Sequence, residues 1–329
     1  MIPENQHIQG AFFKAIGYLD ESKNTVVSVS GGSDSDVVVD FVNQCGIKNN
    51  VRYVFFDTGL EYKATKDHLD YLEKRYGIKI DRIKASKSIP TCCKEYGLPF
   101  LNKFASVIIE RLQKHGFQFE DGSYESLIKK YPHCESALKW WTNGHSTTQW
   151  NISYKKYLKE FLIENPPDFK ISAKCCDYAK KKTAKTYYKQ NDTDIVVTGL
   201  RHSEGGVRSS IYKSCYTVGK PAAYRPIWWF TDGDKQEYIK AYQIQNSKCY
   251  TEYGFKRTGC ACCPFGRKVF AELDATERYE PKLYKAIMNT FGKSYEYTAQ
   301  YYKFRAEKEQ EVARQIRKTP SLENYGGLC

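Results

Sequence analysis

The chain lacks any apolar run close to the roughly 20 residues that a membrane-spanning helix requires. Its first residues, Met-Ile-Pro-Glu-Asn-Gln-His, lack the basic segment and apolar core of a secretory signal. It also has no fixed-period repeat and no low-complexity block. These absences argue against membrane insertion and export, so we expect a cytoplasmic protein with no membrane partner.

A disulfide framework is not expected either, although the chain contains 12 cysteines among its 329 residues. Disulfides persist in oxidising compartments, and no export signal directs the chain to one. Metal or redox chemistry therefore explains the cysteine content better.

Acidic residues are fewer than basic ones: 38 Asp and Glu against 51 Lys and Arg give a formal net charge of +13. Such an excess is typical of proteins with a polyanionic partner, although it also serves general solubility. Tyrosines and lysines interleave in Tyr154-Lys155-Lys156-Tyr157 and again at 178–182. This pattern suits stacking of bases beside cations, but ordinary helix surfaces share it. Contact with nucleic acid and a solvated helix surface are both left open.

A phosphate-binding turn is predicted near residue 30. A β-branched run at 25–30 leads into Gly31 and Gly32, and an apolar segment at 37–42 can begin a helix. Amides of such a turn point to one spot, where the helix dipole favours negative charge, and glycine lets the backbone approach a phosphate. The turn lacks Gly-Lys-Ser/Thr, which excludes the common P-loop of kinases and GTPases. A plain Ser/Gly turn is the alternative.

Alternating strand and helix patterns predict an α/β fold with a doubly wound parallel sheet and right-handed crossovers. We expect the α/β domain to comprise residues 1–90 and 171–270, with a mostly helical insertion at 91–170. Residues 271–329 would form a helical C-terminal extension with a loose tail. The expected strands are 25–30, 51–56, 78–83 and 195–199, and the expected helices are 8–20, 34–45, one after residue 59, 234–245 and most of 277–317.

Three expected strands end in polar residues, and ligands of open parallel sheets bind beyond the carboxyl ends of strands. The pattern Ser30-Gly31-Gly32-Ser33-Asp34-Ser35 resembles the pyrophosphate loop (PP-loop) of the N-type ATP pyrophosphatases. The segment around Asp57-Thr58-Gly59 resembles the nucleoside-binding segment of phosphoadenosine-phosphosulfate (PAPS) reductases. Residues 198–208 resemble the Gly-x-Arg-x-x-Glu-x-x-x-Arg segment of the same superfamily. Taken singly, Asp-Thr-Gly is also a good helix cap and turn, and the arginines could be surface charges.

This resemblance implies a Rossmann-like fold of the adenine nucleotide alpha hydrolase type that binds ATP, or APS or PAPS, with Mg²⁺. It implies that Asp34, Arg201 and Arg208 are catalytic, with Asp34 helping to place Mg²⁺ and Glu204 orienting Arg201 or binding the metal. Guanidinium groups suit phosphate and sulfate because they present a planar fork of donors. The implied nucleotide-binding residues are Ser30, Gly31, Gly32, Ser33, Asp34, Ser35, Asp57, Thr58, Gly59, Gly199, Arg201 and Glu204.

Four cysteines form a second constellation, in which Cys175-Cys176 precedes Cys260-Ala261-Cys262-Cys263. It resembles the Cys-Cys … Cys-x-x-Cys arrangement of the iron–sulfur type of APS reductase. The resemblance implies a [4Fe–4S] cluster on Cys175, Cys176, Cys260 and Cys263, with Zn²⁺ in a four-cysteine site as the competing interpretation. A further adjacent pair, Cys92-Cys93, could be redox-active.

The end of the chain departs from the reductases, which carry a catalytic Cys in a Glu-Cys-Gly-Leu/Ile-His segment. Here Cys329 is the last residue, without the preceding Glu or the following His, so its thiol is poorly held. The resemblance therefore favours relatives that use ATP to put sulfur into nucleic acid, such as the DNA-phosphorothioation (Dnd-type) ATPases and the tRNA-thiolating enzymes.

The predicted function is an ATP pyrophosphatase that adenylates an acceptor for sulfur transfer. Its predicted partners are an adenine nucleotide, a nucleic acid (DNA or tRNA) and a sulfur donor such as a cysteine desulfurase. The alternatives are a sulfonucleotide reductase that forms sulfite and a non-catalytic subunit that binds nucleotide and cluster.

Overall fold

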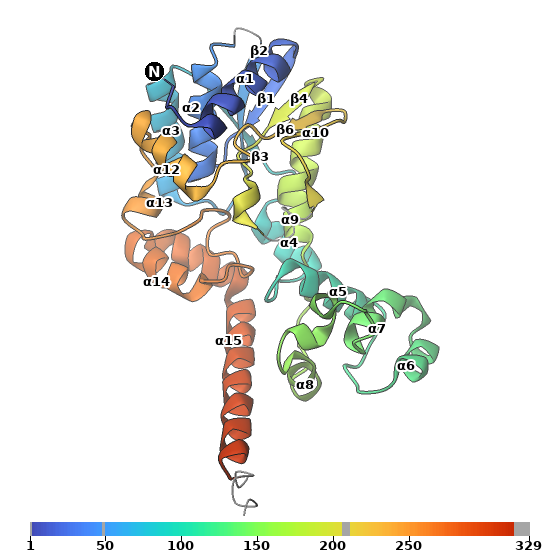
Figure 1. Cartoon of the computed structure of the whole chain (residues 1–329). Helices are drawn as coiled ribbons and strands as arrows, with labels where there is room; N and C mark the ends of the chain where they lie inside the picture. The colour runs from blue at the N-terminus through green and yellow to red at the C-terminus, as the bar shows by residue number, and fades with distance from the viewer. Residues whose placement is uncertain (1, 48–49, 206–210, 319–329) are drawn as a thin grey trace, which may run out of the picture. The chain divides into compact units, whose positions relative to one another are not determined.

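The computed structural model describes residues 2–47, 50–205 and 211–318, and it confirms an α/β fold built on one six-stranded sheet (Figure 1). Five strands are parallel, and β5 runs antiparallel to β6 at one edge. The strands lie in the order β3-β2-β1-β4-β6-β5. Their bounds are β1 Asn24–Ser28, β2 Asn50–Asp57, β3 Ile80–Lys84, β4 Ile195–Val197, β5 Tyr216–Thr217 and β6 Ala222–Tyr224.

The strand order of the sheet reverses at β1, which makes β1 and β4 the strands of the topological switch point. From β1 the chain adds β2 and β3 on one side, and β4 then pairs with the free side of β1. Val26 and Val27 of β1 are both buried, as expected for a parallel strand covered on both faces. In open α/β sheets a ligand binds beyond the carboxyl ends of the strands at such a switch point, here the loops after β1 and β4.

Helices cover both faces of the sheet, which confirms the doubly wound arrangement. On one face, the rings of Phe12 and Phe41 stack with centroids 4.3 Å apart in a large core. On the other face, Tyr187 packs with Val26 and Val54. The helices that contribute to the first core are α1 (Gln6–Asp20), α2 (Ser33–Gln44), α3 (Lys63–Tyr76) and α12 (Asp232–Ala241), and α10 (Thr183–Gln190) covers the second face.

The chain divides into two compact units, and the α/β unit contains residues 2–92, 175–263 and 267–288 as far as they are described. The second unit contains residues 93–174, 264–266 and 289–318 of the described part and is helical. Its core includes Phe100, Leu138, Trp141 and Phe161. The helices that supply or border it are α4 (Ile89–Tyr96), α5 (Lys103–Lys114), α6 (Tyr124–Lys130), α7 (Glu135–Trp141), α8 (Leu158–Glu164) and α15 (Pro281–Lys318).

A short parallel bridge joins the beginning and the end of the inserted segment in the helical unit. The Leu98 amide donates to the Lys170 carbonyl at 2.7 Å, and the Ser172 amide donates to the Leu98 carbonyl at 2.9 Å. Gly97 has a φ of +115°, and a Cβ there would lie 2.2 Å from the Lys170 oxygen. Only glycine fits this approach.

The later part of α15 belongs to the same helical unit. The Tyr297 hydroxyl donates to the Asn165 carbonyl at 2.6 Å, and the Tyr301 hydroxyl donates to the Lys156 carbonyl at 2.9 Å. Ser294 also donates to the Pro99 carbonyl. Two segments more than a hundred residues apart in sequence therefore form one hydrophobic core.

The predicted strands and helices are confirmed with shifts of a few residues. The helix expected after residue 59 begins only at Lys63, and the helix expected at 234–245 begins at Asp232. The sequence analysis did not predict β5, β6 or the short helices α9 (Lys174–Cys176) and α13 (Lys248–Thr251), and it placed α14 (Val269–Tyr279) too late in the chain. Within the described residues, none of the helices is both long and apolar enough to cross a bilayer.

Candidate nucleotide-binding site

The turn at residues 30–35 has the geometry of an anion cradle. Gly31 has a φ of +66°, and Gly32 is the N-cap of α2 without a side chain to cap the helix. The Ser35 hydroxyl accepts the Ser30 amide at 2.9 Å, which closes the turn. The first-turn amides of α2 therefore receive no hydrogen bond from a side chain of the N-cap residue.

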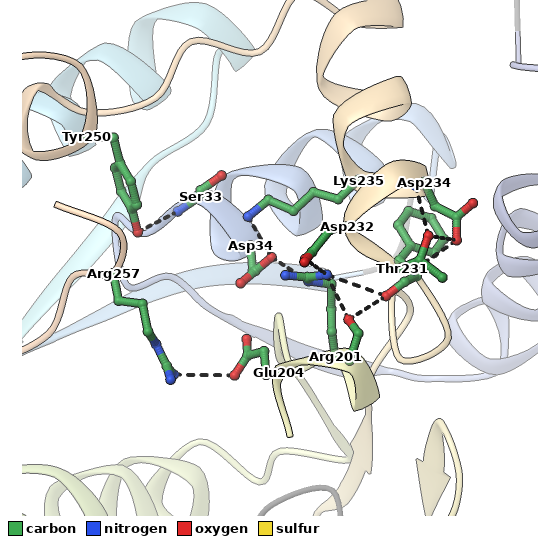
Figure 2. A network of polar contacts seen from close by, with 12 residues as sticks. Ser33, Asp34, Arg201, Glu204, Thr231, Asp232, Asp234, Lys235, Tyr250 and Arg257 are labelled. Carbon is green, nitrogen blue, oxygen red and sulfur yellow. Dashed lines mark hydrogen bonds and ion pairs between the residues drawn. The ribbon is translucent and has the colours of Figure 1, made fainter. Parts of the chain in front are cut away.

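Tyr250 lies over this turn from α13. Its hydroxyl accepts the Ser33 amide at 3.1 Å (Figure 2). The same hydroxyl lies 3.2 Å from the Thr258 hydroxyl. A Cβ on Gly32 would lie 2.9 Å from Thr258 Oγ1 and 3.2 Å from the Tyr250 hydroxyl. A phenol oxygen thus occupies the first backbone amide of α2, that of Ser33.

Gly199 brings the loop after β4 against the turn. A Cβ at this position would lie 2.7 Å from the Asp34 carbonyl oxygen and 3.0 Å from the Ser35 amide nitrogen. Both contacts are to backbone, which cannot move aside as a side-chain tip can. Gly199 is therefore required for the two loops of the switch point to meet.

Two cations converge on Asp34 (Figure 2). Its Oδ1 lies 2.8 Å from Arg201 Nε and 2.9 Å from Lys235 Nζ. The side chains of Arg201 and Lys235 are only 7% and 12% exposed, so the charges are largely shielded from water. Arg201 also contacts the Asp232 carboxylate at 2.8 Å, but Asp232 is 87% exposed. The two shielded cations therefore share one partly buried carboxylate, Asp34, and the Glu204 carboxyl lies beside it.

The environment of Asp34 keeps it ionised. Burial raises the pKa of this carboxyl, but Lys235 and Arg201 outweigh burial and hold the pKa below its usual value. The sequence analysis assigned Mg²⁺ placement to Asp34, and one oxygen of that carboxylate, Oδ1, contacts both cations. The Mg²⁺ role of Asp34 stays a prediction.

The start of α12 fixes the position of Lys235. Thr231 and Asp234 form a capping box, in which the Asp234 amide donates to Thr231 Oγ1 at 3.1 Å and the Thr231 amide donates to the Asp234 carboxylate at 2.8 Å. Asn5 and His7 also bind the Asp234 carboxylate, at 2.8 and 2.9 Å. This network orders the first turn of α12, which carries Lys235.

Asp57, Thr58 and Gly59 form a self-contained turn after β2. Asp57 Oδ1 accepts the Gly59 amide at 2.8 Å, and the Thr58 hydroxyl donates to Glu61 at 2.6 Å. Gly59 has a φ of +88°. The turn lies at the carboxyl end of its strand as expected, and its assignment to the nucleoside stays a prediction.

Glu204 contacts a different arginine from the one expected. Its carboxylate lies 3.3 Å from Arg257, whereas Arg201 is oriented by Asp34, Asp232 and the Ser203 hydroxyl (Figure 2). Two other predicted positions, Arg208 and Cys329, lie outside the described residues.

The four cysteines of the second constellation are brought together in part. Cys260 and Cys263 share one tight turn, in which the Cys263 amide donates to the Cys260 carbonyl at 3.3 Å. Desolvation lowers the pKa of the Lys180 ammonium, but Cys260, Glu61 and Cys176 outweigh it and raise this pKa above its usual value. Cys176 and Cys260 thus lie near the same ammonium. Across the described ranges, no three Cys, His, Asp or Glu side chains are close enough to hold a metal ion.

Cys262 has a separate environment. It is fully buried, its amide donates to the Tyr62 hydroxyl at 2.9 Å, and its sulfur lies 3.1 Å from Thr276 Oγ1. These contacts anchor the middle of the Cys-x-x-Cys turn to α14 and to the residue before α3.

The sequence analysis missed Lys235, Asp232, Tyr250 and Thr258. The pattern Thr231-x-x-Asp234 is typical of a capping box at the start of a helix. It could have predicted that Lys235 lies in the first turn of a helix. No local pattern marks Tyr250, because its role depends on an approach across 217 positions of sequence.

Comparison with known proteins identifies related sequences. A family model described as phosphoadenosine phosphosulfate reductase domain matches residues 24–105 and 114–265. An uncharacterised protein of Methanocaldococcus jannaschii is 34% identical over 283 residues. The match covers 84% of this chain but 44% of that protein, so the chain spans less than half the length of this relative.

Solved structures with similar folds are more distant in sequence. A phosphoadenylyl-sulfate reductase from Candida auris in complex with phosphate is 15% identical, with 78% of this chain and 89% of that chain covered and a TM-score of 0.41. An NH₃-dependent NAD synthetase from Campylobacter jejuni is 13% identical, with 88% and 95% covered and a TM-score of 0.34. An NMN synthetase from Francisella tularensis is 13% identical, with 72% and 71% covered and a TM-score of 0.33.

Proposed function

Because the chain belongs to the phosphoadenosine phosphosulfate reductase family, we propose that it binds ATP with the phosphates on the turn at residues 30–35 and cleaves it to AMP and pyrophosphate. The observation that carries the proposal is the convergence of Arg201 and Lys235 beside the start of α2, whose N-cap residue, Gly32, has no side chain to cap the helix. Two shielded cations and a helix N-terminus favour a bound polyanion.

The proposed reaction is adenylation of an acceptor. An acceptor oxygen attacks the α-phosphorus, the bond from that phosphorus to the bridging oxygen breaks, and pyrophosphate leaves with the bonding electrons. Arg201 and Lys235 stabilise the charge that develops on the leaving group, and the α2 amides orient it. A sulfur nucleophile then forms a bond to the acceptor atom that carries the adenylated oxygen. The bond from that atom to the oxygen breaks, and AMP leaves with the oxygen and the bonding electrons.

The phosphates would compete with Asp34 for the two cations. Before ATP binds, Asp34 holds both in place and compensates their charge. Arg201 also forms an ion pair with Asp232, and this ion pair can persist when the guanidinium turns from Asp34 toward a phosphate. Mg²⁺ is proposed only as the ion that accompanies ATP.

We also propose that Cys175, Cys176, Cys260 and Cys263 hold a [4Fe–4S] cluster, with Zn²⁺ as the alternative. The thiol donors are of the right kind, and Cys176 and Cys260 share the neighbourhood of Lys180. Such a cluster, when bound, would supply a site for sulfide or electrons, and no step above depends on it.

The test is pyrophosphate release from ATP by anaerobically purified protein, with single-stranded nucleic acid as acceptor and a cysteine desulfurase with cysteine as sulfur source. We expect Arg201→Ala and Lys235→Ala each to lower release about 100-fold, the usual loss for one charge-stabilising group. Arg257→Ala is the matched control, because the Arg257 side chain is 72% exposed and contacts Glu204 and not Asp34. Equal release from all four proteins would contradict the proposal.

The family itself supports a second candidate, reductive cleavage of APS or PAPS to sulfite with a dithiol reductant. That activity would appear as sulfite release that Cys329→Ser removes. ATP binding without release of pyrophosphate or sulfite, under every acceptor tried, would instead identify a binding subunit.

A further inference from the structure

The helical unit carries a stretch of one-sided charge. From Ser136 to Lys159 the chain contains four lysines and no aspartate or glutamate. The same stretch contains five aromatic residues, Trp140, Trp141, Trp150, Tyr154 and Tyr157. The first two are buried in the core of the unit, so they serve packing and leave the other three for another role.

Two of these aromatic rings are unusually exposed. Tyr154 is 59% exposed and Trp150 is 41% exposed. The Trp150 ring is held edge-on by Phe104, with centroids 5.1 Å apart, and the Lys155 ammonium lies 5.6 Å from the Tyr154 ring centre. Exposed aromatic rings beside cations are the groups on which single-stranded nucleic acid stacks in proteins that bind it.

A pocket of about 270 Å³ is lined by residues of the same segment, among them the immediate sequence neighbours of Tyr154. Three lysines, Lys155, Lys156 and Lys159, line it together with Asn143 and Tyr157, and Glu160 is its one acidic lining residue. Lys155 and Lys156 are exposed. Lys156 lies 4.0 Å from Glu309 and Lys159 lies 2.5 Å from Asp121, and exposed pairs of this kind are weak enough for a phosphate to compete with the carboxylates. A pocket with this lining favours an anionic ligand with flat polar groups.

The loop that carries the rings is ordered before any ligand binds. Asn151 is 7% exposed, and its side chain accepts the His145 amide at 3.0 Å and donates to the His145 carbonyl at 2.9 Å. The Tyr301 hydroxyl of α15 holds the Lys156 carbonyl. Preorganisation of this kind lowers the entropy cost of binding.

We propose that the surface formed by residues 143–159, called here the Lys155 surface, binds single-stranded nucleic acid. Bases stack on Trp150 and Tyr154, and phosphates contact Lys155 and Lys156. Unstacked bases are required because paired bases of a duplex do not expose their faces to such rings. This assignment rests on the proposed function, for which it identifies where the acceptor polymer binds.

The test is fluorescence anisotropy of a labelled single-stranded oligonucleotide with the full chain, without ATP. We expect Trp150→Ala and Tyr154→Ala each to weaken binding about tenfold, which is typical for one stacked base. The double variant Lys155→Ala with Lys156→Ala should reduce the slope of log affinity against log salt by about 1.4, or roughly 0.7 per lost phosphate contact. Trp150→Phe, which keeps a ring, should retain most of the affinity.

Matched controls lie in the α/β unit. Trp229 is 50% exposed, and Trp229→Ala should leave affinity unchanged. Lys282→Ala with Lys285→Ala removes the same charge from exposed positions and should leave the salt slope unchanged.

Three outcomes would overturn the proposal. They are ring variants that bind as tightly as the unaltered chain, a duplex that binds as tightly as the single strand, and polyglutamate that competes with the oligonucleotide at equal charge. The last would assign the surface to an acidic protein. The ATP-induced shift in melting temperature is measured on the same variants, and its absence in the unaltered chain would count against the nucleotide site and not against this surface.

Discussion

Asp34 Oδ1 lies 2.8 Å from Arg201 Nε, although 167 positions separate the two residues in sequence. The contact joins the loops after β1 and β4, the two neighbouring strands at which the strand order reverses. It places a buried cation at the start of α2, where an anion is favoured twice over, by the guanidinium and by the helix dipole.

Asp34→Ala should lower pyrophosphate release, because Arg201 and Lys235 lose the carboxylate that holds them in place before ATP binds. It should also lower the free energy of unfolding by about 3 kcal/mol, because it leaves two shielded cations without their shared carboxylate. Urea unfolding and the pyrophosphate assay measure the two effects. Asp232→Ala removes the exposed partner of Arg201 and should cost less than about 1 kcal/mol. Equal losses in the two variants would show that the buried position has no special role.

Tyr250→Phe should lower the melting temperature without nucleotide and enlarge the stabilisation by ATP. The phenol occupies the Ser33 amide, so its removal costs about 1 kcal/mol in the free protein and frees that amide for a phosphate oxygen. Tyr253→Phe, which loses a hydrogen bond to Glu280 from the same segment, should show the first effect only. A smaller ATP shift in Tyr250→Phe would mean that the hydroxyl binds the nucleotide itself.

Gly199→Ala should weaken ATP binding about tenfold or more, since the new Cβ meets the Asp34 backbone at 2.7 Å and must push the turn out of position. Isothermal titration with ATP measures the loss. Gly17→Ala in α1 is the control: nothing lies within 4 Å of its Cβ, so it should stabilise the protein by up to about 1 kcal/mol. Unaltered ATP affinity in Gly199→Ala would separate the β4 loop from the nucleotide site.

Asp234→Asn should make stability less dependent on acid pH. Burial raises the Asp234 pKa, but hydrogen bonds from the Thr231 amide, Asn5 and His7 outweigh it and depress the pKa well below the usual value. A depressed carboxyl pKa contributes stability that is complete above about pH 4 and is lost as pH falls toward the folded-state pKa.

Urea unfolding at about pH 7 and about pH 3 tests this expectation. The unaltered chain should exceed Asp234→Asn in stability by about 1 kcal/mol at the higher pH and by less at the lower. A gap that widens on acidification would contradict the assignment. Asp67→Asn, at an exposed pair with Lys63, should change little at either pH.

Cys260→Ser should lower the iron and acid-labile sulfide content of anaerobically purified protein and bleach the broad absorption near roughly 400 nm that such clusters show. Cys45→Ser is the control, because this half-buried thiol lies in the core that packs on the sheet. A colourless protein that contains zinc, with a loss of zinc in Cys260→Ser, would favour the Zn²⁺ alternative.

Local patterns predicted most of the α/β unit. The turn at residues 30–35 was predictable because its glycines and the flanking strand and helix are contiguous in sequence. β6 was missed because only three residues form it, Ala222–Tyr224, and alanine carries no strand preference. Its pairing with β4 is a tertiary contact, which the alternation of polar and apolar residues along one segment cannot predict.

The site residues that were predicted are polar or charged residues that closely follow a predicted strand, as Asp34 and Arg201 do. Lys235 and Tyr250 were not predicted because they reach the turn from elements far along the chain. Glu204 was expected to orient Arg201 or to bind the metal, whereas Arg201 contacts Asp34, Ser203 and Asp232, and Glu204 lies 3.3 Å from Arg257. Spacing within one motif does not report such competition between partners.

The bridge between Leu98 and Ile171 has an evolutionary consequence. It brings the two ends of the insertion within hydrogen-bond distance of each other, so a tight turn could replace everything between them. Tyr297 and Tyr301 of α15 remove that freedom, because loss of the insertion would expose the apolar face of a helix encoded more than a hundred residues later. The two segments must therefore be gained, lost or exchanged together, and related proteins should vary them as one inherited block.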